Sequence, residues 1–287
     1  MKVAHYGASV LAAALLGAVL TPGAAHAAQT AAPAAQYTPS VGQEGKDVIW
    51  VPTPQALVER MLTIAEVKPT DYVMDLGSGD GRTVITAAKK FGARALGIEY
   101  NPDMVELSRR NAEKEGVADR AQFRRADIFA TDLSDATVIT MYLLPSLNLK
   151  LRPTLLNLKP GTRLVSHAFT MDDWQPDQTE NADGRTAYLW IVPAKVEGRW
   201  RIDLIGANPA HYDVQLRQRF QNLDGEARAG NDVLQIRDGK VRGEEVMFTV
   251  SDGKSAGRVF TGRLSGERLE GTSRGGSAAR WTGTRTR

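Results

Sequence analysis

The segment 75–81, Asp-Leu-Gly-Ser-Gly-Asp-Gly, has the residue types of a ligand-binding turn. Its glycines let the backbone turn tightly and approach a ligand without interference from a Cβ atom. A helix that follows such a turn offers its first N–H groups to a carboxylate or a phosphate. A dinucleotide fingerprint, Gly-x-Gly-x-x-Gly, needs glycine at the position of Arg82. The segment therefore predicts a ligand loop that does not bind a nicotinamide dinucleotide.

Two more acidic positions follow later predicted strands. Glu99, in Gly-Ile-Glu-Tyr-Asn, is placed to accept hydrogen bonds from both hydroxyls of a ribose. Asp127 precedes Ile128, and this pair suits an adenine, because the carboxylate accepts from the exocyclic amine while the ring packs on the aliphatic side chain. Each acidic residue alone is also explained as a helix cap. The order of all three motifs on successive strands is what favours an adenosine ligand.

Alternating strands and helices would bring these motifs to one edge of a sheet. Thr53-Pro54 is typical of a helix start, with threonine as the N-cap and proline as the first helical residue. Strand–helix alternation predicts a parallel sheet covered by helices on both faces, with ligands at the carboxyl ends of its strands. We expect further helices at 82–91, 102–115 and 146–158, and strands at 72–76, 93–99, 121–125, 138–142, 163–168 and 188–192.

The chain after Pro193 loses the helical period and has the pattern of short strands. Asp238-Gly239, Asp252-Gly253 and Ser265-Gly266 are typical of hairpin turns. The predicted fold class is therefore α/β, with a Rossmann-like, mostly parallel sheet followed by a small antiparallel β-barrel or meander. The expected strands are 200–204, 211–220, 233–236, 245–250, 258–264 and 280–284.

Composition and charge exclude several kinds of site. Of 287 residues, 42% are hydrophobic and 24% are charged, which is ordinary for a globular protein. The chain contains no Cys, which excludes thiolate zinc sites, Fe–S clusters and cysteine nucleophiles, and no metal site is expected. Residues 195–287 carry 17 Lys and Arg against 12 Asp and Glu. Because the two signs are interleaved, a solvated surface is favoured over a nucleic-acid site.

The first 27 residues have the features of a secretory signal peptide. Lys2 precedes an apolar run over residues 8–20, and Ala25-His26-Ala27 matches a small-x-small cleavage site. The run is shorter than the roughly 20 residues of a membrane-spanning helix, and an uncleaved anchor at 8–20 is the alternative. The lone charge of Lys2 ahead of the run predicts that the body lies outside the cytoplasm, as a periplasmic or secreted protein. Residues 28–45 are expected to be a flexible linker.

Taken in order, the motifs at 75–81, 99 and 127–128 resemble those of class I S-adenosylmethionine-dependent methyltransferases. Val51-Pro52-Thr53-Pro54 and the segment 142–148, Tyr-Leu-Leu-Pro-Ser-Leu-Asn, are similar to the protein-lysine methyltransferases of the ATP synthase c-subunit type, as is Val-Ser-His at 165–167. The resemblance covers residues 46–194. It divides the chain into a signal peptide (1–27), a linker (28–45), a methyltransferase domain (46–194) and an appended β-rich domain (195–287).

The resemblance implies a methyltransferase that uses S-adenosyl-L-methionine. The glycines would line the methionine end, the acid of the second motif would hold the ribose, and the Val51-Pro52-Thr53 segment would close over the cofactor. The cofactor-binding residues implied are Val51, Thr53, Asp75, Gly77, Ser78, Gly79, Gly81, Glu99, Tyr100, Asp127 and Ile128. Those implied at the acceptor pocket are Tyr142, Leu144 and Pro145.

The resemblance also implies a protein lysine as the acceptor, with proximity to a membrane as one alternative. A lysine amine must be neutral to attack a methyl group, and its ordinary pKa of about 10.4 requires that an apolar pocket favour the neutral form. No residue stands out as an obligatory base, and His167 fits a buried structural role better than that of a base. Two alternatives stay open: a small-molecule methyltransferase, and an exported protein that binds an adenosine-like ligand without catalysis.

Overall fold

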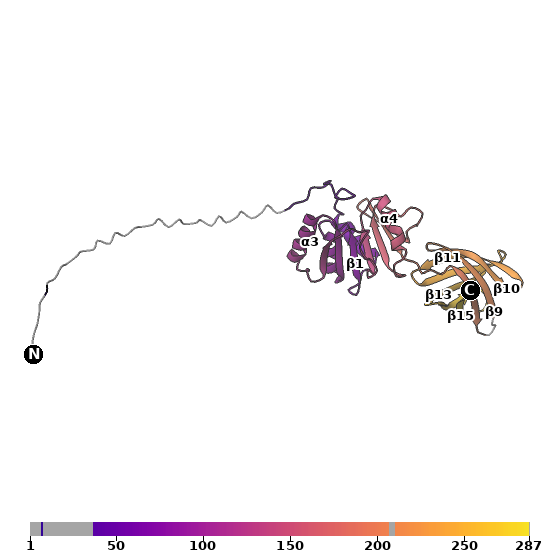
Figure 1. The fold of residues 1–287 in the computed structure, drawn as a ribbon. Helices are drawn as coiled ribbons and strands as arrows, with labels where there is room; N and C mark the ends of the chain where they lie inside the picture. Colours follow the sequence, from indigo (N-terminus) through magenta and orange to yellow (C-terminus); the bar gives the residue numbers. More distant parts are fainter. Residues whose placement is uncertain (1–6, 8–36, 207–209, 287) are drawn as a thin grey trace, which may run out of the picture. The chain divides into compact units, whose positions relative to one another are not determined.

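Helices and strands alternate through the first half of the chain in a computed structural model that describes residues 7, 37–206 and 210–286 (Figure 1). The expected signal peptide, and the alternative anchor at 8–20, lie outside the described residues apart from Gly7. The helices are α1 (Gln55–Ile64), α2 (Arg82–Phe91), α3 (Pro102–Lys114) and α4 (Pro145–Leu155). None of the helices in the described part of the chain is long and apolar enough to cross a membrane.

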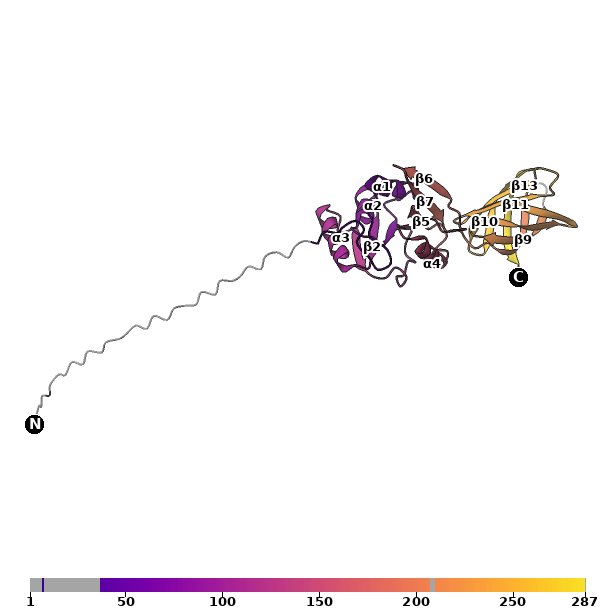
Figure 2. The ribbon, with the colours of Figure 1, turned by 90° about the horizontal axis from the view of Figure 1, so that it is seen from above.

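These helices flank a mixed sheet whose strands follow the order β3-β2-β1-β4-β5-β7-β6. Its strands are β1 (Tyr72–Leu76), β2 (Arg94–Glu99), β3 (Ala121–Arg125), β4 (Val138–Met141), β5 (Arg163–His167), β6 (Gln178–Ala182) and β7 (Arg185–Ile191). β1 to β5 are parallel, whereas β7 runs antiparallel to both β5 and β6, beside which it lies in Figure 2. The chain leaves β1 for β2 and β3 on one side and returns to β4 on the other. β1 therefore lies at the switch point, where parallel sheets bind ligands.

Each face of the sheet is covered by its own hydrophobic cluster. Along β1, Val73 packs in a cluster with side chains of α1, α2 and α3, whereas Met74 and Leu76 pack in a second cluster with Leu151 and Leu155 of α4. The alternation follows from the two-residue period of a strand. Because both faces are covered, β1 is buried along nearly its whole length, as the strands of parallel sheets are. The prediction of helices on both faces is confirmed.

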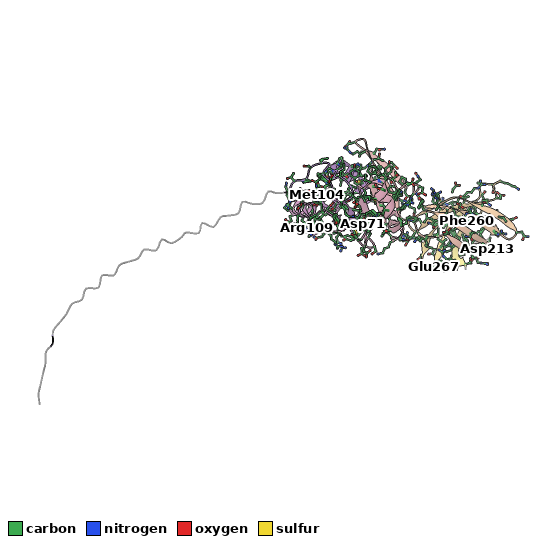
Figure 3. The ribbon with its side chains drawn as sticks, turned by 45° about the horizontal axis from the view of Figure 1, so that its top comes forward. Asp71, Met104, Arg109, Asp213, Phe260 and Glu267 are labelled. Atoms are coloured by element: carbon green, nitrogen blue, oxygen red, sulfur yellow. The ribbon has the colours of Figure 1, made fainter. Side chains whose placement is uncertain are left out.

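The last eight strands form a closed antiparallel barrel. Of the two predicted forms, a barrel or a meander, the structure has the barrel. Its interior is filled by aromatic side chains, including Trp200, Phe248, Trp281 and Phe260, the last of which is labelled in Figure 3. Closure comes from pairing of the final strand with the first. The strands are β8 (Gly198–Ile205), β9 (Ala210–Arg219), β10 (Asn222–Ala229), β11 (Asp232–Arg242), β12 (Glu245–Ser251), β13 (Arg258–Ser265), β14 (Arg268–Arg274) and β15 (Ala279–Thr286).

Two local predictions are wrong. Thr53 does not cap α1, because the helix begins at Gln55 with Pro54 at the N-cap position and no side-chain cap; the Thr53 hydroxyl bonds to His167 instead. Asp238-Gly239 is not a hairpin turn but lies inside β11, where the pairing with β12 shifts register. Asp238 has a φ of 53°, and the two residues make a β-bulge, which bends a strand without ending it.

The end of the expected linker is hydrogen-bonded to the residues that follow it. Within residues 40–50 the backbone N–H of Gly42 donates to the carbonyl of Trp50 at 2.9 Å, and that of Trp50 donates to the carbonyl of Gln43 at 2.9 Å. A β-bridge joins Glu44 to Ile49. We call residues 40–50 the strap. Its hydrogen bonds join residues on both sides of position 46, where the methyltransferase domain was expected to begin.

Candidate functional site

A cavity of about 670 Å³ lies where β1, β2 and β4 end. This volume is within the range of small-molecule sites. The strap, the loops after these strands and Met104 of α3, labelled in Figure 3, contribute to its lining. All of the residues that the sequence implied for the cofactor and the acceptor line the cavity except Gly81 and Pro145.

Gly81 and Pro145 have structural places beside the cavity. Gly81 has a φ of 83°, and a Cβ atom there would lie 2.7 Å from the ring of Phe123 and 2.9 Å from Ser108. It therefore allows the glycine-rich loop to pack against β3 and α3 rather than facing a ligand. Pro145 is the first residue of α4, where the missing N–H of proline costs no hydrogen bond.

The glycine-rich loop is held by its neighbours from both sides. The backbone N–H groups of Gly77 and Ser78 donate to the carbonyl of Ile98, at 2.9 and 3.1 Å. On the opposite side, the Ser108 hydroxyl of α3 donates to the carbonyl of Gly79 at 2.7 Å. The Ser78 side chain is 5% exposed and its hydroxyl has no partner among the described residues. This oxygen packs against Gly97, where an added Cβ atom would lie 2.5 Å from it, so Gly97 lets the loop lie close to β2.

Glu99, at the end of β2, is fixed by two backbone donors. Its Oε2 accepts from the N–H of Gly79 at 3.0 Å, and its Oε1 accepts from the N–H of Asn101 at 2.9 Å. Carboxylate oxygens each have two lone pairs. The side chain therefore keeps acceptor capacity toward the cavity, as a ribose would require.

Asp127 is paired with a residue that the sequence did not single out. Its Oδ1 accepts from the N–H of Phe129 at 2.9 Å, and its Oδ2 lies 3.0 Å from Nζ of Lys46 in the strap. The Phe129 hydrogen bond and the Lys46 ammonium hold the pKa of Asp127 below its usual range. Lys46 also lies 5.3 Å from the ring centroid of Tyr100. The strap therefore contacts Asp127, predicted to bind the adenine, and Tyr100, another predicted cofactor residue.

The strap reaches the glycine-rich loop as well. A Cβ atom on Gly79, which has a φ of 54°, would lie 2.6 Å from Nε1 of Trp50. Only a residue without a side chain permits this approach. Trp50 and Lys46 line the cavity and were both missed, because an isolated tryptophan and lysine in a polar, Gly-containing segment carry no periodic signal.

Asp75, the acid that precedes the glycines, is a buried carboxyl on the cavity wall. It is 7% exposed, and the Thr140 hydroxyl of β4 donates to its Oδ1 at 2.6 Å. Burial raises the pKa of Asp75 to about 7, and the hydrogen bonds from Thr140 and Thr83 oppose the shift only in part. Near neutral pH this group can therefore exchange a proton when a cation arrives beside it.

The side of the cavity that was predicted to take the acceptor is lined by aromatic and aliphatic side chains. Tyr142 and Phe169 line it with ring centroids 6.0 Å apart, together with Leu144 and Leu147. Behind them His167 stacks on Tyr142 with centroids 3.8 Å apart and is 3% exposed. Burial and the charge of Arg185 lower the pKa of His167 to about 4, so the imidazole is neutral at neutral pH.

Comparison with known proteins places this site in a family. Residues 75–178 match the model of the ANTKMT methyltransferase domain. The chain is 44% identical over 151 residues to a protein-lysine N-methyltransferase of Saccharolobus islandicus, covering 50% of this chain and 94% of that protein. This chain belongs to that family of S-adenosylmethionine-dependent methyltransferases.

Two further relatives of the methyltransferase have different described substrates. The adenine nucleotide translocase lysine N-methyltransferase of Mus musculus is 33% identical over 154 residues, covering 53% of this chain and 61% of the mouse protein. A solved structure described as an RNA methyltransferase from Salinibacter ruber, in complex with S-adenosyl-L-homocysteine, is 54% identical, with a TM-score of 0.50. It covers 51% of this chain and 96% of that chain. Each of these two matches covers about half of the length of this chain.

Proposed function

We propose that this methyltransferase transfers the methyl group of S-adenosylmethionine to a lysine amine of a protein. The observation that carries the proposal is the wall of Tyr142, Phe169, Leu144 and Leu147 beside the glycine-rich loop. An apolar wall desolvates an ammonium group and favours its neutral form. The names of the relatives from Saccharolobus islandicus and Mus musculus support a lysine as the acceptor.

The cavity fits the cofactor. Gly77 and Gly79 line it without side chains, and Glu99 has acceptor capacity on the cavity side. Asp127, Ile128 and Tyr100 would hold the adenosine, and Asp75 would face the amino group of the methionine end. When bound, S-adenosylmethionine supplies a methyl group on a positively charged sulfur. The residues of this chain have to align an amine with that methyl group and keep water away.

An RNA acceptor is the second candidate, because the relative from Salinibacter ruber is described as an RNA methyltransferase. RNA sites gather unpaired cations that contact phosphates. In the described part of this cavity both cationic lining residues already have acidic partners: Lys46 pairs with Asp127, and Arg82 pairs with Asp80 at 2.6 Å. The protein acceptor is therefore the one that the site supports better.

Labelling decides between the acceptors. The purified chain would be incubated with methyl-labelled S-adenosylmethionine and, in separate reactions, with envelope proteins, total RNA and a lipid and small-molecule extract. We expect label in polypeptide that is recovered as methyl-lysine after acid hydrolysis. Label confined to RNA, lipid or small molecules would overturn the lysine assignment. Omission of the enzyme and the Glu99→Ala variant are the controls for non-enzymatic transfer.

We also propose that the protein is exported. Lys2, the apolar run at 8–20 and the Ala-His-Ala site at 25–27 support this location. An envelope location would put the cavity among envelope proteins, which is why they are the first acceptors to test.

A further inference from the structure

We infer that His167 is a positioning residue that joins the cofactor-binding loop to the wall of the acceptor pocket. His167 comes from β5 and does not line the cavity. Its Nδ1 lies 3.1 Å from the Thr53 hydroxyl, and its ring stacks on Tyr142 with an interplanar angle of 30°. Thr53 and Tyr142 both line the cavity. One buried imidazole thus holds two lining residues that are far apart in the sequence.

The contact continues from Thr53 to the glycine-rich loop. The carbonyl of Thr53 accepts from Nη1 of Arg82 at 2.9 Å. The Arg82 guanidinium in turn donates to both carboxylate oxygens of Asp80, which belongs to that loop. A paired guanidinium and carboxylate fix both distance and orientation. The contacts therefore run without a gap from Asp80 through Arg82, Thr53 and His167 to Tyr142.

The Thr53 hydroxyl is available for this contact because it does not cap α1. A threonine before Pro54 would ordinarily accept from the first N–H groups of the helix, but α1 has no side-chain cap. The hydroxyl is buried, with Thr53 9% exposed. A buried hydroxyl needs a partner, and His167 supplies it. The Thr53 hydroxyl therefore links two walls of the cavity through His167 instead of capping α1.

The geometry does not suit His167 as a general base. Tyr142 covers one face of the imidazole, Thr53 occupies Nδ1, and His167 as a whole is 3% exposed. Arg185 is the charged group that acts on its titration, and together with burial it keeps the imidazole neutral at neutral pH. A neutral ring is a good stacking and hydrogen-bonding partner. Its effect on transfer therefore comes through Tyr142 and Thr53, whose placement sets how an acceptor amine meets the methyl group.

The experiment uses four variants of the full chain. His167→Phe keeps the stacked ring but removes the hydrogen bond, and Thr53→Val removes the same bond from the other side. The third variant combines both changes. Thr63→Val is the matched control, because the Thr63 hydroxyl is exposed and bonds only to the carbonyl of Glu59 among the described residues.

The inference rests on the proposed function, since it places the acceptor beside Tyr142. We expect each single variant to transfer methyl groups about 10- to 100-fold more slowly, and His167→Phe to keep a calorimetric affinity for S-adenosylmethionine close to that of the wild type. The double variant should be no slower than the slower single variant, because both changes remove one interaction. The pH dependence of the rate should keep its shape in His167→Phe.

Three results would overturn the inference. Additive losses in the double variant would mean that Thr53 and His167 act separately. Loss of one limb of the pH–rate profile in His167→Phe would make the histidine a base. A loss of cofactor affinity in His167→Phe as large as its loss of transfer rate would mean that His167 acts on cofactor binding rather than on the acceptor.

Failure of the proposed function is a separate outcome. If the wild-type chain labels no protein, denaturant midpoints of the same variants still test the Thr53–His167 link. The midpoint shifts should then be non-additive, and additive shifts would refute the link.

Discussion

The backbone N–H of Gly79 donates to Oε2 of Glu99 across 3.0 Å. The loop after β1 and the acid that ends β2 are therefore one hydrogen-bonded unit. A ligand that contacts the loop with one end and Glu99 with its other end is positioned by both at once. This bond also explains why the two motifs lie in a fixed register on neighbouring strands, since Leu76 pairs with Ile98.

Replacement of Glu99 should weaken cofactor binding. Glu99→Ala removes the acceptor for the ribose hydroxyls and releases the N–H of Gly79, so we expect a loss of about 1.5–3 kcal/mol of binding free energy. Isothermal titration calorimetry with S-adenosylmethionine measures it. Glu106→Ala is the control, because this glutamate of α3 is exposed and does not line the cavity. Unchanged affinity in Glu99→Ala would refute the ribose assignment.

Side chains at position 79 should clash with the strap. Gly79→Val should abolish cofactor binding while far-UV circular dichroism still reports the strands of the barrel, because the clash is local. Gly79→Ala should bind weakly, and adding Trp50→Ala should restore part of the affinity, since Nε1 of Trp50 is the atom that the new Cβ would meet. If Trp50→Ala restores nothing, the strained backbone at a φ of 54° is the cause instead.

The ordinary pKa of Asp75 is 3.8, and its pKa in the folded chain is about 7. Between these two pH values the free energy of unfolding of the methyltransferase should depend on pH through Asp75. In this window the folded chain holds a proton that the unfolded chain has lost. The free energy of unfolding should therefore fall as pH rises, by at most about 1.4 kcal/mol per pH unit from this group. Asp75→Asn should remove that part of the slope in denaturant titrations. An identical slope in the variant would contradict the assignment.

The same carboxyl should couple cofactor binding to proton release. S-adenosylmethionine is cationic at its methionine end, and a cation beside Asp75 favours the ionised carboxylate. Binding should then release a proton and tighten as pH rises toward 7. Calorimetry in two buffers with different ionisation enthalpies counts the protons released, and Asp75→Asn should release fewer than the wild type.

Tyr142 should matter more for transfer than for cofactor binding. Tyr142→Ala opens the aromatic wall and exposes the acceptor amine to water, which favours the charged ammonium form. We expect protein labelling to fall at least about 10-fold, with little change in calorimetric affinity for the cofactor. Equal losses in both measurements would mean that Tyr142 shapes the cofactor site only.

The export proposal predicts a mature N-terminus at Ala28. Mass spectrometry of the protein from its native source, with cell fractionation, tests both the cleavage site and the compartment. An intact Met1 on a cytoplasmic protein would refute export.

Much of the sheet and its site could be predicted because the signals are local. β1 is a short apolar run closed by an acid and glycines, and α2 lies at the predicted 82–91. By contrast, β10 and β14 could not be recognised, since their inward positions are occupied in part by Gly225 and Gly271. Small residues suit the interior of a small barrel where Trp281 and Phe260 already fill the space, but they give no apolar alternation in the sequence.

The strap and the His167 contacts could not be predicted for a different reason. Lys46 meets Asp127, and Thr53 meets His167, only after the sheet has assembled, so their partners are distant in the sequence. The same distance explains the wrong N-cap at Thr53. A local rule assigned its hydroxyl to the next helix turn, whereas the fold offered a buried partner from β5.

Pairing of β15 with β8 has a consequence for synthesis on the ribosome. β8 is the first strand of the barrel to be synthesised, and it pairs with β15, the last, from Arg280↔Ile205 to Thr286↔Arg199. Until β15 is made, β8 presents an unpaired edge, the kind of surface that recruits strands from other chains. A stop codon or a proteolytic cut before β15 would leave two such edges, on β8 and β14. Truncated products are therefore expected to aggregate or be degraded rather than accumulate beside the complete protein.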